Sequence, residues 1–200
     1  TLGFDDLRRH LKNYPPEIME EQTGIDANLS REVAHLYAKT NKGIIFWGMG
    51  VSQHIHGTDN ARCLISLALM TGNVGRRGSG LHPLRGQNNV QGASDAGLIP
   101  MMYPDYQLVE KNDKKGLTVV EIMDAIHENT IKGMYILGEN PAMSDPDLNH
   151  AREALQMLEH LVVQDIFLTE TATYADVIFP ASAWPEKNGT ATNTNRQVQM

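Results

Sequence analysis

The sequence has a single cysteine, Cys63, among 200 residues. One thiol cannot close a disulfide within the chain. It also cannot supply the several thiolates that a cysteine-built zinc or iron–sulfur site requires, so no metal site of that kind is expected here. Cys63 lies in the middle of an apolar stretch, and we therefore expect it to be packed and not nucleophilic.

Long apolar runs and a leader pattern are also missing. No apolar run approaches the roughly 18 residues that span a bilayer, so no direct membrane insertion is expected. The formal net charge of −7 argues against a nucleic-acid-binding surface. The first residue, Thr1, is not an initiator methionine, and we interpret the chain as a piece of a longer polypeptide.

A third absence is local, because no aspartate or glutamate occurs from Asn60 to Ser94. The same window contains four arginines, at positions 62, 76, 77 and 85. A local anion site explains this pattern, since a nearby carboxylate would compete for the guanidinium groups. The alternative is a buried helix followed by a basic, solvated loop.

Arg85 lies in GSGLHPLRGQNNVQGASDAG (78–97), a stretch with too many glycines for a helix and too few apolar residues for a core strand. Pro83 restricts the backbone before Arg85, and Gly86 makes the backbone after it more flexible. Gln87 and Asn88 offer amides that can orient a ligand. A guanidinium forms a planar fork that matches a carboxylate. The alternative role is an arginine that bridges two domains through backbone carbonyls.

Helical and strand patterns alternate along the chain. Helices are expected at 29–40, capped by Ser30 with an inward stripe at Val33, Leu36 and Tyr37, and at 58–70, 118–126 and 147–158. Strands are expected at 44–47, 134–137, 161–164 and 176–180, and a hairpin turn at 188–189. This order predicts an α/β fold with mostly parallel sheets in two halves, 1–86 and 87–200.

Polar residues directly follow two of the predicted strands. Gly138, Glu139 and Asn140 come after one strand, and Gln164 and Asp165 end the next. Ligands of open parallel sheets bind at the carboxyl ends of strands. A glycine there lets a phosphate or ribose approach, and a carboxylate suits ribose hydroxyls or guanine. These residues predict a nucleotide site, although the GxGxxG dinucleotide fingerprint is missing.

The histidine pair His54 and His56 would point to one side of a strand and could bind a metal. No third ligand is near in the sequence, so we expect hydrogen bonds within a loop instead, and no metal site. His82 is nearer to Arg85 and has two interpretations, a proton relay or a simple loop contact, of which we expect the loop contact.

The runs WGMGVSQHIHGTDNARCLISLALMTGNVGRRGSGLHPLRGQNNVQGASDAG, MYILGENP and VVQDIFLTETATYADVIFPASAWPEKNGT, followed by TNTNRQVQ, resemble the molybdopterin-dependent formate dehydrogenase catalytic (alpha) subunit. The form HPLRGQNN resembles the cytoplasmic members. The resemblance implies molybdenum or tungsten held by two molybdopterin guanine dinucleotides, formate and carbon dioxide as reactants, and electron-transfer subunits or domains as partners. It assigns formate orientation to Arg85.

The same resemblance assigns pterin contacts to Gly86, Gln87 and Asn88. It assigns a guanine dinucleotide arm to the strand-end residues and to Thr169. The family's metal-binding cysteine or selenocysteine and its 4Fe-4S cluster would lie upstream, so this chain alone is expected to be inactive. Two alternatives stay open: a nucleotide-binding or assembly module without redox chemistry, and a related oxidoreductase with another small anion as substrate.

Overall fold

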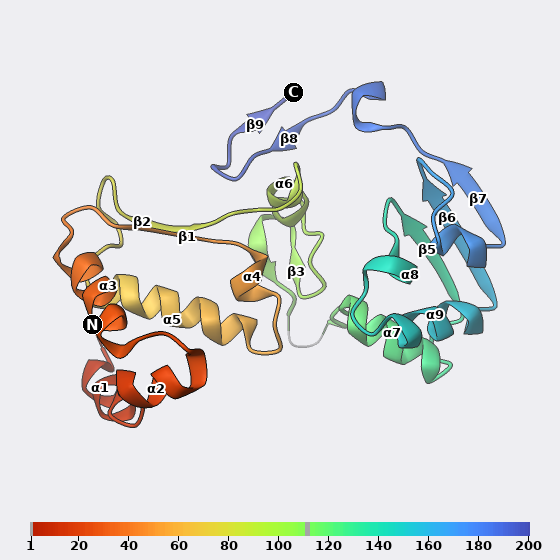
Figure 1. The fold of residues 1–200 in the computed structure, drawn as a ribbon. Coiled ribbons are helices and arrows are strands. Elements are labelled where there is room, and N and C mark those ends of the chain that lie inside the picture. Colours follow the sequence, from red (N-terminus) through yellow and green to blue (C-terminus); the bar gives the residue numbers. More distant parts are fainter. Residues whose placement is uncertain (1, 111–112) are drawn as a thin grey trace. The chain divides into compact units, whose positions relative to one another are not determined.

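The fold is known from a computed structural model, which describes residues 2–110 and 113–200. The chain divides into two compact units, one ending at Gln87 and the other comprising Asn88–Met200. The first unit contains, in order, α1 (Phe4–Leu11), α2 (Pro16–Thr23), α3 (Ala27–Lys39), β1 (Ile44–Trp47), α4 (Met49–Ser52), α5 (Gly57–Met70) and β2 (Gly80–Pro83) (Figure 1).

The second unit contains more elements and a larger sheet. In order they are α6 (Val90–Asp95), β3 (Met102–Tyr103), η1 (Pro104–Tyr106), β4 (Gln107–Leu108), α7 (Val119–His127), β5 (Gly133–Leu137), α8 (Pro141–Ser144), α9 (Leu148–Met157), β6 (His160–Asp165), η2 (Thr171–Tyr174), β7 (Val177–Pro180), η3 (Trp184–Glu186), β8 (Ala191–Thr192) and β9 (Val198–Gln199).

The predicted parallel pairing is confirmed in both units. In the first, β1 and β2 pair in parallel from Ile44↔Gly80 to Trp47↔Pro83. In the second, β5, β6 and β7 form a parallel sheet in chain order. Two short antiparallel pairs, β3–β4 and β8–β9, and an isolated bridge between Ile99 and Met102 complete the pairing among the described residues.

The core of the second unit lies between one face of its sheet and two helices. Ile136, Leu161 and Val163 project from this face and are buried with Leu155 of α9. Helices α7 and α9 pack side by side (Figure 1), with Met123, Ile126 and Ala154 buried between them. The opposite face of the sheet carries Tyr135, Leu137 and Phe179, which are exposed.

Local signals explain where several helices begin. A capping box starts α7, since Thr118 accepts a hydrogen bond from the Glu121 backbone N–H and the Glu121 carboxylate accepts one from the Thr118 backbone N–H. Asp147 caps α9 by accepting from the His150 N–H at 3.3 Å. The predicted cap of α3 was wrong, because Asp26, and not Ser30, accepts from the Leu29 N–H at 2.8 Å and starts the helix earlier.

Residues 78–97 were expected to lack regular structure, and this was wrong for two parts. Residues 80–83 form β2, because the Gly80 N–H donates to the Gly43 carbonyl and brings the segment alongside β1. Residues 90–95 form the short helix α6 around a buried Gln91. Strand pairing and side-chain hydrogen bonds here outweigh the low intrinsic preference of these residues for strand or helix.

The hairpin turn predicted at Asn188–Gly189 was also wrong. The chain turns instead at Asn193–Gln197, where the Asn193 N–H donates to the Gln197 carbonyl and Arg196 adopts a left-handed φ of 65°. The Asn193 side chain accepts from the Gln197 N–H at 3.0 Å, which fixes the turn between β8 and β9.

Burial in the first unit is lower than the sequence suggested. Val33 and Leu36 of α3 are 57% and 70% exposed, and β1 exposes Ile44 and Phe46. Helix α5 buries only Gly57 and Ala68, and Cys63 is exposed, so its expected packing was wrong. Apolar periodicity indicates which face of a helix is apolar. How much of that face is buried depends on the elements that pack against it.

Replacing Leu155 by alanine should lower the free energy of unfolding of the second unit by about 2–5 kcal/mol, because it leaves a cavity against the sheet. Met157→Ala, two residues on and 48% exposed, is the matched control and should change it by less than about 0.5 kcal/mol. Urea unfolding followed by circular dichroism measures both. Equal effects would contradict the assignment of the core.

Candidate functional site

The first candidate region is the carboxyl edge of the β1–β2 pair. The Leu84 N–H donates to the Trp47 carbonyl at 2.7 Å, so β1 and β2 end together and Arg85 follows at that edge. Arg85 is half-buried, whereas Gly86 and Gln87 are exposed. A Cβ added to Gly86 would lie 3.7 Å from the Met49 sulfur, which is an ordinary contact, so Gly86 borders α4 without being crowded.

The other arginines of the carboxylate-free window have local partners or face solvent. Arg62 pairs with Asp59, just outside the window, at 3.0 Å and is largely exposed. Arg76 donates at 3.0 Å to Asn73, a buried side chain that also accepts from the Gly43 N–H. Arg77 is exposed. Arg85, by contrast, follows directly after the paired ends of β1 and β2.

The second candidate region is the carboxyl edge of the β5–β6–β7 sheet. Gly138 directly follows β5, and its N–H donates to the Gln164 carbonyl at 2.9 Å, which places the two predicted residues side by side. Asp165 ends β6, and its carbonyl accepts from the Ala181 N–H after β7 at 3.0 Å. Three strand ends thus meet at one edge, and they include the two adjacent strand ends that the sequence hypothesis names.

Gly138 provides open space at this edge. Its φ is 67°, a left-handed value that favours glycine, and nothing lies within 4 Å of the place a Cβ would occupy. A ligand group can therefore approach the backbone here closely. The edge therefore combines open space beside the Gly138 backbone with the nearby carboxylate of Asp165.

The polar side chains at this edge are already oriented by the protein. The Tyr135 hydroxyl donates to Gln164 Oε1 at 2.7 Å, and Asp165 Oδ1 accepts from the Ile166 N–H at 2.6 Å. Thr169 Oγ1 accepts from the Ala172 N–H at 3.4 Å. Glu139 is exposed beside them.

Asn140 holds a network that the sequence analysis missed in part. Its Oδ1 accepts from the Thr171 backbone N–H at 3.1 Å and from the Thr171 hydroxyl at 2.7 Å. Its amide donates to the Glu170 carboxylate at 2.7 Å. The hydrogen bond from Asn140, assisted by the charge of Arg152, lowers the pKa of Glu170. Thr171 gave no signal in the sequence beyond the polar run 169–171 that follows β6.

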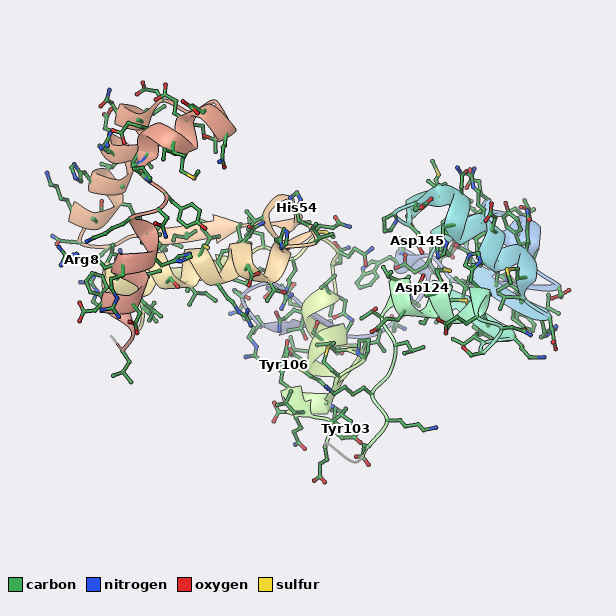
Figure 2. All side chains as sticks on the ribbon, turned by 90° about the horizontal axis from the view of Figure 1, so that it is seen from below. Arg8, His54, Tyr103, Tyr106, Asp124 and Asp145 are labelled. Atoms are coloured by element: carbon green, nitrogen blue, oxygen red, sulfur yellow. The ribbon has the colours of Figure 1, made fainter. Side chains whose placement is uncertain are left out.

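Asn88 and its neighbours belong to a different cluster in the second unit. Asn88 is exposed, while Asn89 Oδ1 accepts from the Thr192 N–H at 2.9 Å. The buried Gln91 donates to Asp95 and to the Tyr106 hydroxyl (Tyr106 is labelled in Figure 2), and Arg196 pairs with Asp95 at 3.3 Å.

These bonds tie α6 to the β8–β9 hairpin. Desolvation opposes the ionisation of Asp95, but the hydrogen bonds and Arg196 together still lower its pKa. The side-chain amides of Asn89 and Gln91 therefore help to organise this part of the second unit.

His54 and His56 lie in the loop before α5, whereas His82 lies on a strand. His54 Nε2 lies 2.7 Å from the Gly50 carbonyl, and His56 is at the N-cap of α5 without a side-chain cap (His54 is labelled in Figure 2). His82 was expected in a loop but lies on β2, where its ring packs against Phe46 at 5.3 Å between centroids. In residues 2–110 and 113–200, no three His, Cys, Asp or Glu side chains are grouped to hold a metal ion.

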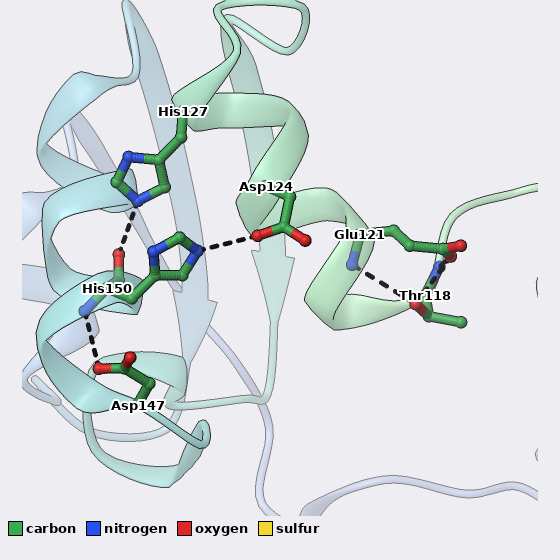
Figure 3. A network of polar contacts seen from close by, with 6 residues as sticks. All are labelled: Thr118, Glu121, Asp124, His127, Asp147 and His150. Carbon is green, nitrogen blue, oxygen red and sulfur yellow. Dashed lines mark hydrogen bonds and ion pairs between the residues drawn. The ribbon is translucent and has the colours of Figure 1, made fainter. Parts of the chain in front are cut away.

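A further polar network joins α7 to α9 (Figure 3). His150 Nε2 lies 3.1 Å from Asp124, and His127 Nε2 lies 3.0 Å from the His150 carbonyl, with the two rings stacked 4.1 Å apart. An open cavity of about 340 Å³ borders this network, and desolvation raises the pKa of Asp145 in its wall. The cavity is lined by Val120, Met123, Asp124, Asp145, Pro146, Asp147 and His150.

The two strand edges define a parallel α/β protein of the type that binds ligands beyond its strand ends. The sequence profile of the molybdopterin oxidoreductases matches residues 7–200, and the chain belongs to the molybdopterin oxidoreductase family. Acetylene hydratase from Pelobacter acetylenicus has the same fold, with a TM-score of 0.74 and 19% identity over 96% of this chain and 31% of that protein.

Curated relatives are more similar in sequence. The chain is 47% identical to F420-dependent formate dehydrogenase subunit alpha of Methanocaldococcus jannaschii, over 100% of this chain and 32% of that protein. It is 40% identical to formate dehydrogenase H of Escherichia coli, over 100% of this chain and 30% of that protein. The chain thus spans about a third of the length of these relatives. No helix among the described residues is long and apolar enough to cross a membrane.

Gly138→Ala should lower the free energy of unfolding by about 1–2 kcal/mol, because alanine is strained in the left-handed region. Gly189→Ala is the matched control, since Gly189 has equally open surroundings and no positive φ. Urea unfolding of the two variants compares them. A Gly138→Ala protein as stable as the control would contradict the backbone conformation at this edge.

Glu170 should make stability depend on pH. Because its pKa is lowered in the folded protein, its contribution is fully present above the unfolded value of about 4.3 and is lost as the pH falls through the lower folded value. The free energy of unfolding should therefore fall less steeply in Glu170→Gln than in the wild type over this acidic range. Parallel slopes in urea titrations would contradict the Asn140–Glu170 hydrogen bond.

Proposed function

We propose that this chain forms part of the catalytic subunit of a formate dehydrogenase, which oxidises formate to carbon dioxide. The observation that carries the proposal is the 40–47% identity to named formate dehydrogenases along the whole chain. The positions of Arg85 at one strand edge and of Gly138 and Asp165 at another support it. Electron-transfer subunits or domains are the expected partners, and the cytoplasm is the expected location.

Arg85 binds and orients formate in this proposal. The guanidinium offers two parallel N–H donors to the two carboxylate oxygens and fixes the direction of the formate C–H bond. The absence of Asp and Glu from Asn60 to Ser94 removes competing anions from the sequence around it. Oxidation breaks the C–H bond and yields carbon dioxide, one proton and two electrons, and the pterin-held molybdenum or tungsten would accept the electrons.

The edge of the β5–β6–β7 sheet binds a guanine dinucleotide arm of the cofactor. Gly138 leaves room for a phosphate next to the backbone, and the Asp165 carboxylate accepts hydrogen bonds from a guanine edge or ribose. Glu139, Gln164 and Thr169 add polar groups at the same edge. Gly86, Gln87 and Asn88 are assigned to the pterin.

The remaining parts of the catalytic centre are expected outside this chain. They are the cysteine or selenocysteine that ligates the metal, the domain that covers the second dinucleotide, and the 4Fe-4S cluster that carries electrons away. We therefore expect the 200-residue chain by itself not to turn over formate, whereas the intact protein does.

Arg85→Lys in the intact protein should reduce kcat/KM for formate by about 10- to 100-fold, which corresponds to about 1–3 kcal/mol, because lysine keeps the charge but loses the fork. The control is Arg8→Lys, an exposed arginine of α1 (Figure 2), which should leave the kinetics unchanged. Formate-dependent reduction of a dye acceptor measures both.

Unchanged kinetics in Arg85→Lys would contradict the assigned role. Turnover of another small anion, such as nitrate, but not of formate would retain the anion-binding arginine and reject the substrate. A cofactor-loaded intact protein without any redox activity would favour a nucleotide-binding or assembly module.

A further inference from the structure

The hydrogen-bonding groups of Asn140 are turned toward the protein. A side-chain amide oxygen has two lone pairs, and both face Thr171, one accepting from the backbone N–H and one from the hydroxyl. One of the two amide N–H groups donates to Glu170. Both acceptor positions of the Asn140 side-chain oxygen are therefore occupied within the protein. One amide N–H is left for a ligand.

Thr171 continues the network into the interior. It is completely buried, and its hydroxyl donates to Asn140 while accepting from the Ala142 N–H at 3.1 Å. Ala142 in turn offers its carbonyl to Arg152 of α9 at 2.9 Å. A buried hydroxyl with both roles satisfied is costly to disturb, because each lost bond leaves an unpaired polar group.

These bonds connect two segments about 30 positions apart in the chain. Asn140 and Ala142 follow β5, whereas Glu170 and Thr171 follow β6. The same two segments carry the groups that face the strand edge, with Gly138 two residues before Asn140 and Thr169 two residues before Thr171. Parallel strands fix where each segment starts, and the hydrogen bonds of Asn140 and Thr171 then link the two segments beyond the sheet.

We propose that Asn140, Thr171 and Glu170 form a clamp that sets the positions of the loops after β5 and β6, and that Asn140 is a positioning residue without direct ligand contact. The consequence for ligand binding rests on the proposed function, since the clamp then holds Gly138, Asp165 and Thr169 ready for the dinucleotide arm. Holding the loops in place before binding lowers the entropy lost when the ligand arrives.

Exchanging the charged and neutral partners tests the clamp. Asn140→Asp keeps the oxygen that accepts from Thr171 but places a second carboxylate against Glu170, so the two repel each other. Adding Glu170→Gln restores the hydrogen bond in the opposite direction, because the amide at position 170 now donates to the carboxylate at position 140. The exchange therefore repairs the contact between these two side chains, because it removes the repulsion and restores a hydrogen bond.

The first measurement is the affinity of the full chain for guanosine diphosphate, by calorimetry at about pH 8 where both carboxyl groups are ionised. Asn140→Asp should raise Kd by about tenfold, and the combined variant should return it to within about threefold of the wild type. Glu170→Gln alone, which keeps an acceptor for the Asn140 amide, is the matched control and should change Kd by less than about threefold. A combined variant as weak as Asn140→Asp would mean that the Asn140 amide contacts the nucleotide itself, and would overturn the proposal.

The second measurement is amide hydrogen exchange at Thr171 and Ala142, which requires no ligand. Both amides should exchange about tenfold faster in Asn140→Asp and recover together in the combined variant. This result supports the clamp even if guanosine diphosphate does not bind, in which case the dinucleotide site alone is rejected. Unchanged exchange in Asn140→Asp would overturn the clamp.

Discussion

The structure depends on parallel pairing of strands that end at a common edge. Leu137 lies opposite Gln164, and Asp165 lies opposite Pro180, so the segments that leave β5, β6 and β7 start next to one another. Backbone hydrogen bonds continue this alignment past the strands, from the Gly138 N–H to Gln164 and from the Ala181 N–H to Asp165. Strand pairing thus brings residues that are far apart in sequence to one edge of the sheet.

The same geometry recurs on a smaller scale in the other unit. The bond from the Leu84 N–H to the Trp47 carbonyl places Arg85 beyond the ends of two parallel strands. In each unit the sheet contributes rigid positions and the following loop contributes chemistry, as is usual for α/β proteins. The strand-end position of Arg85 and the open edge at Gly138 are both products of this arrangement.

Local signals in the sequence were sufficient where a short pattern decides the structure. Patterns within a few residues predicted the capping box at Thr118 and Glu121. They also predicted the strands around Ile136 and Val163 and their parallel order. The polar residues at the strand ends were found for the same reason, because a strand followed by Gly138 or Asp165 is visible in the sequence.

Long-range partners could not be predicted in this way. Thr171 looks like an ordinary loop threonine, and only its contacts with Asn140 and Ala142 give it a role. Asp26, and not Ser30, caps α3. Both residue types can cap a helix, and which one does so depends on where the chain enters the helix. The exposure of Val33 and Leu36 was missed because periodicity does not name the surface that packs against a helix.

A structure of the intact protein with its cofactor, determined by crystallography or electron microscopy, tests the central claim most directly. The account predicts a guanine nucleotide against Gly138 and Asp165 at the β5–β6 edge, and the Arg85 guanidinium facing the pterin-held metal. A nucleotide bound elsewhere, or an Arg85 side chain directed to bulk solvent, would contradict it.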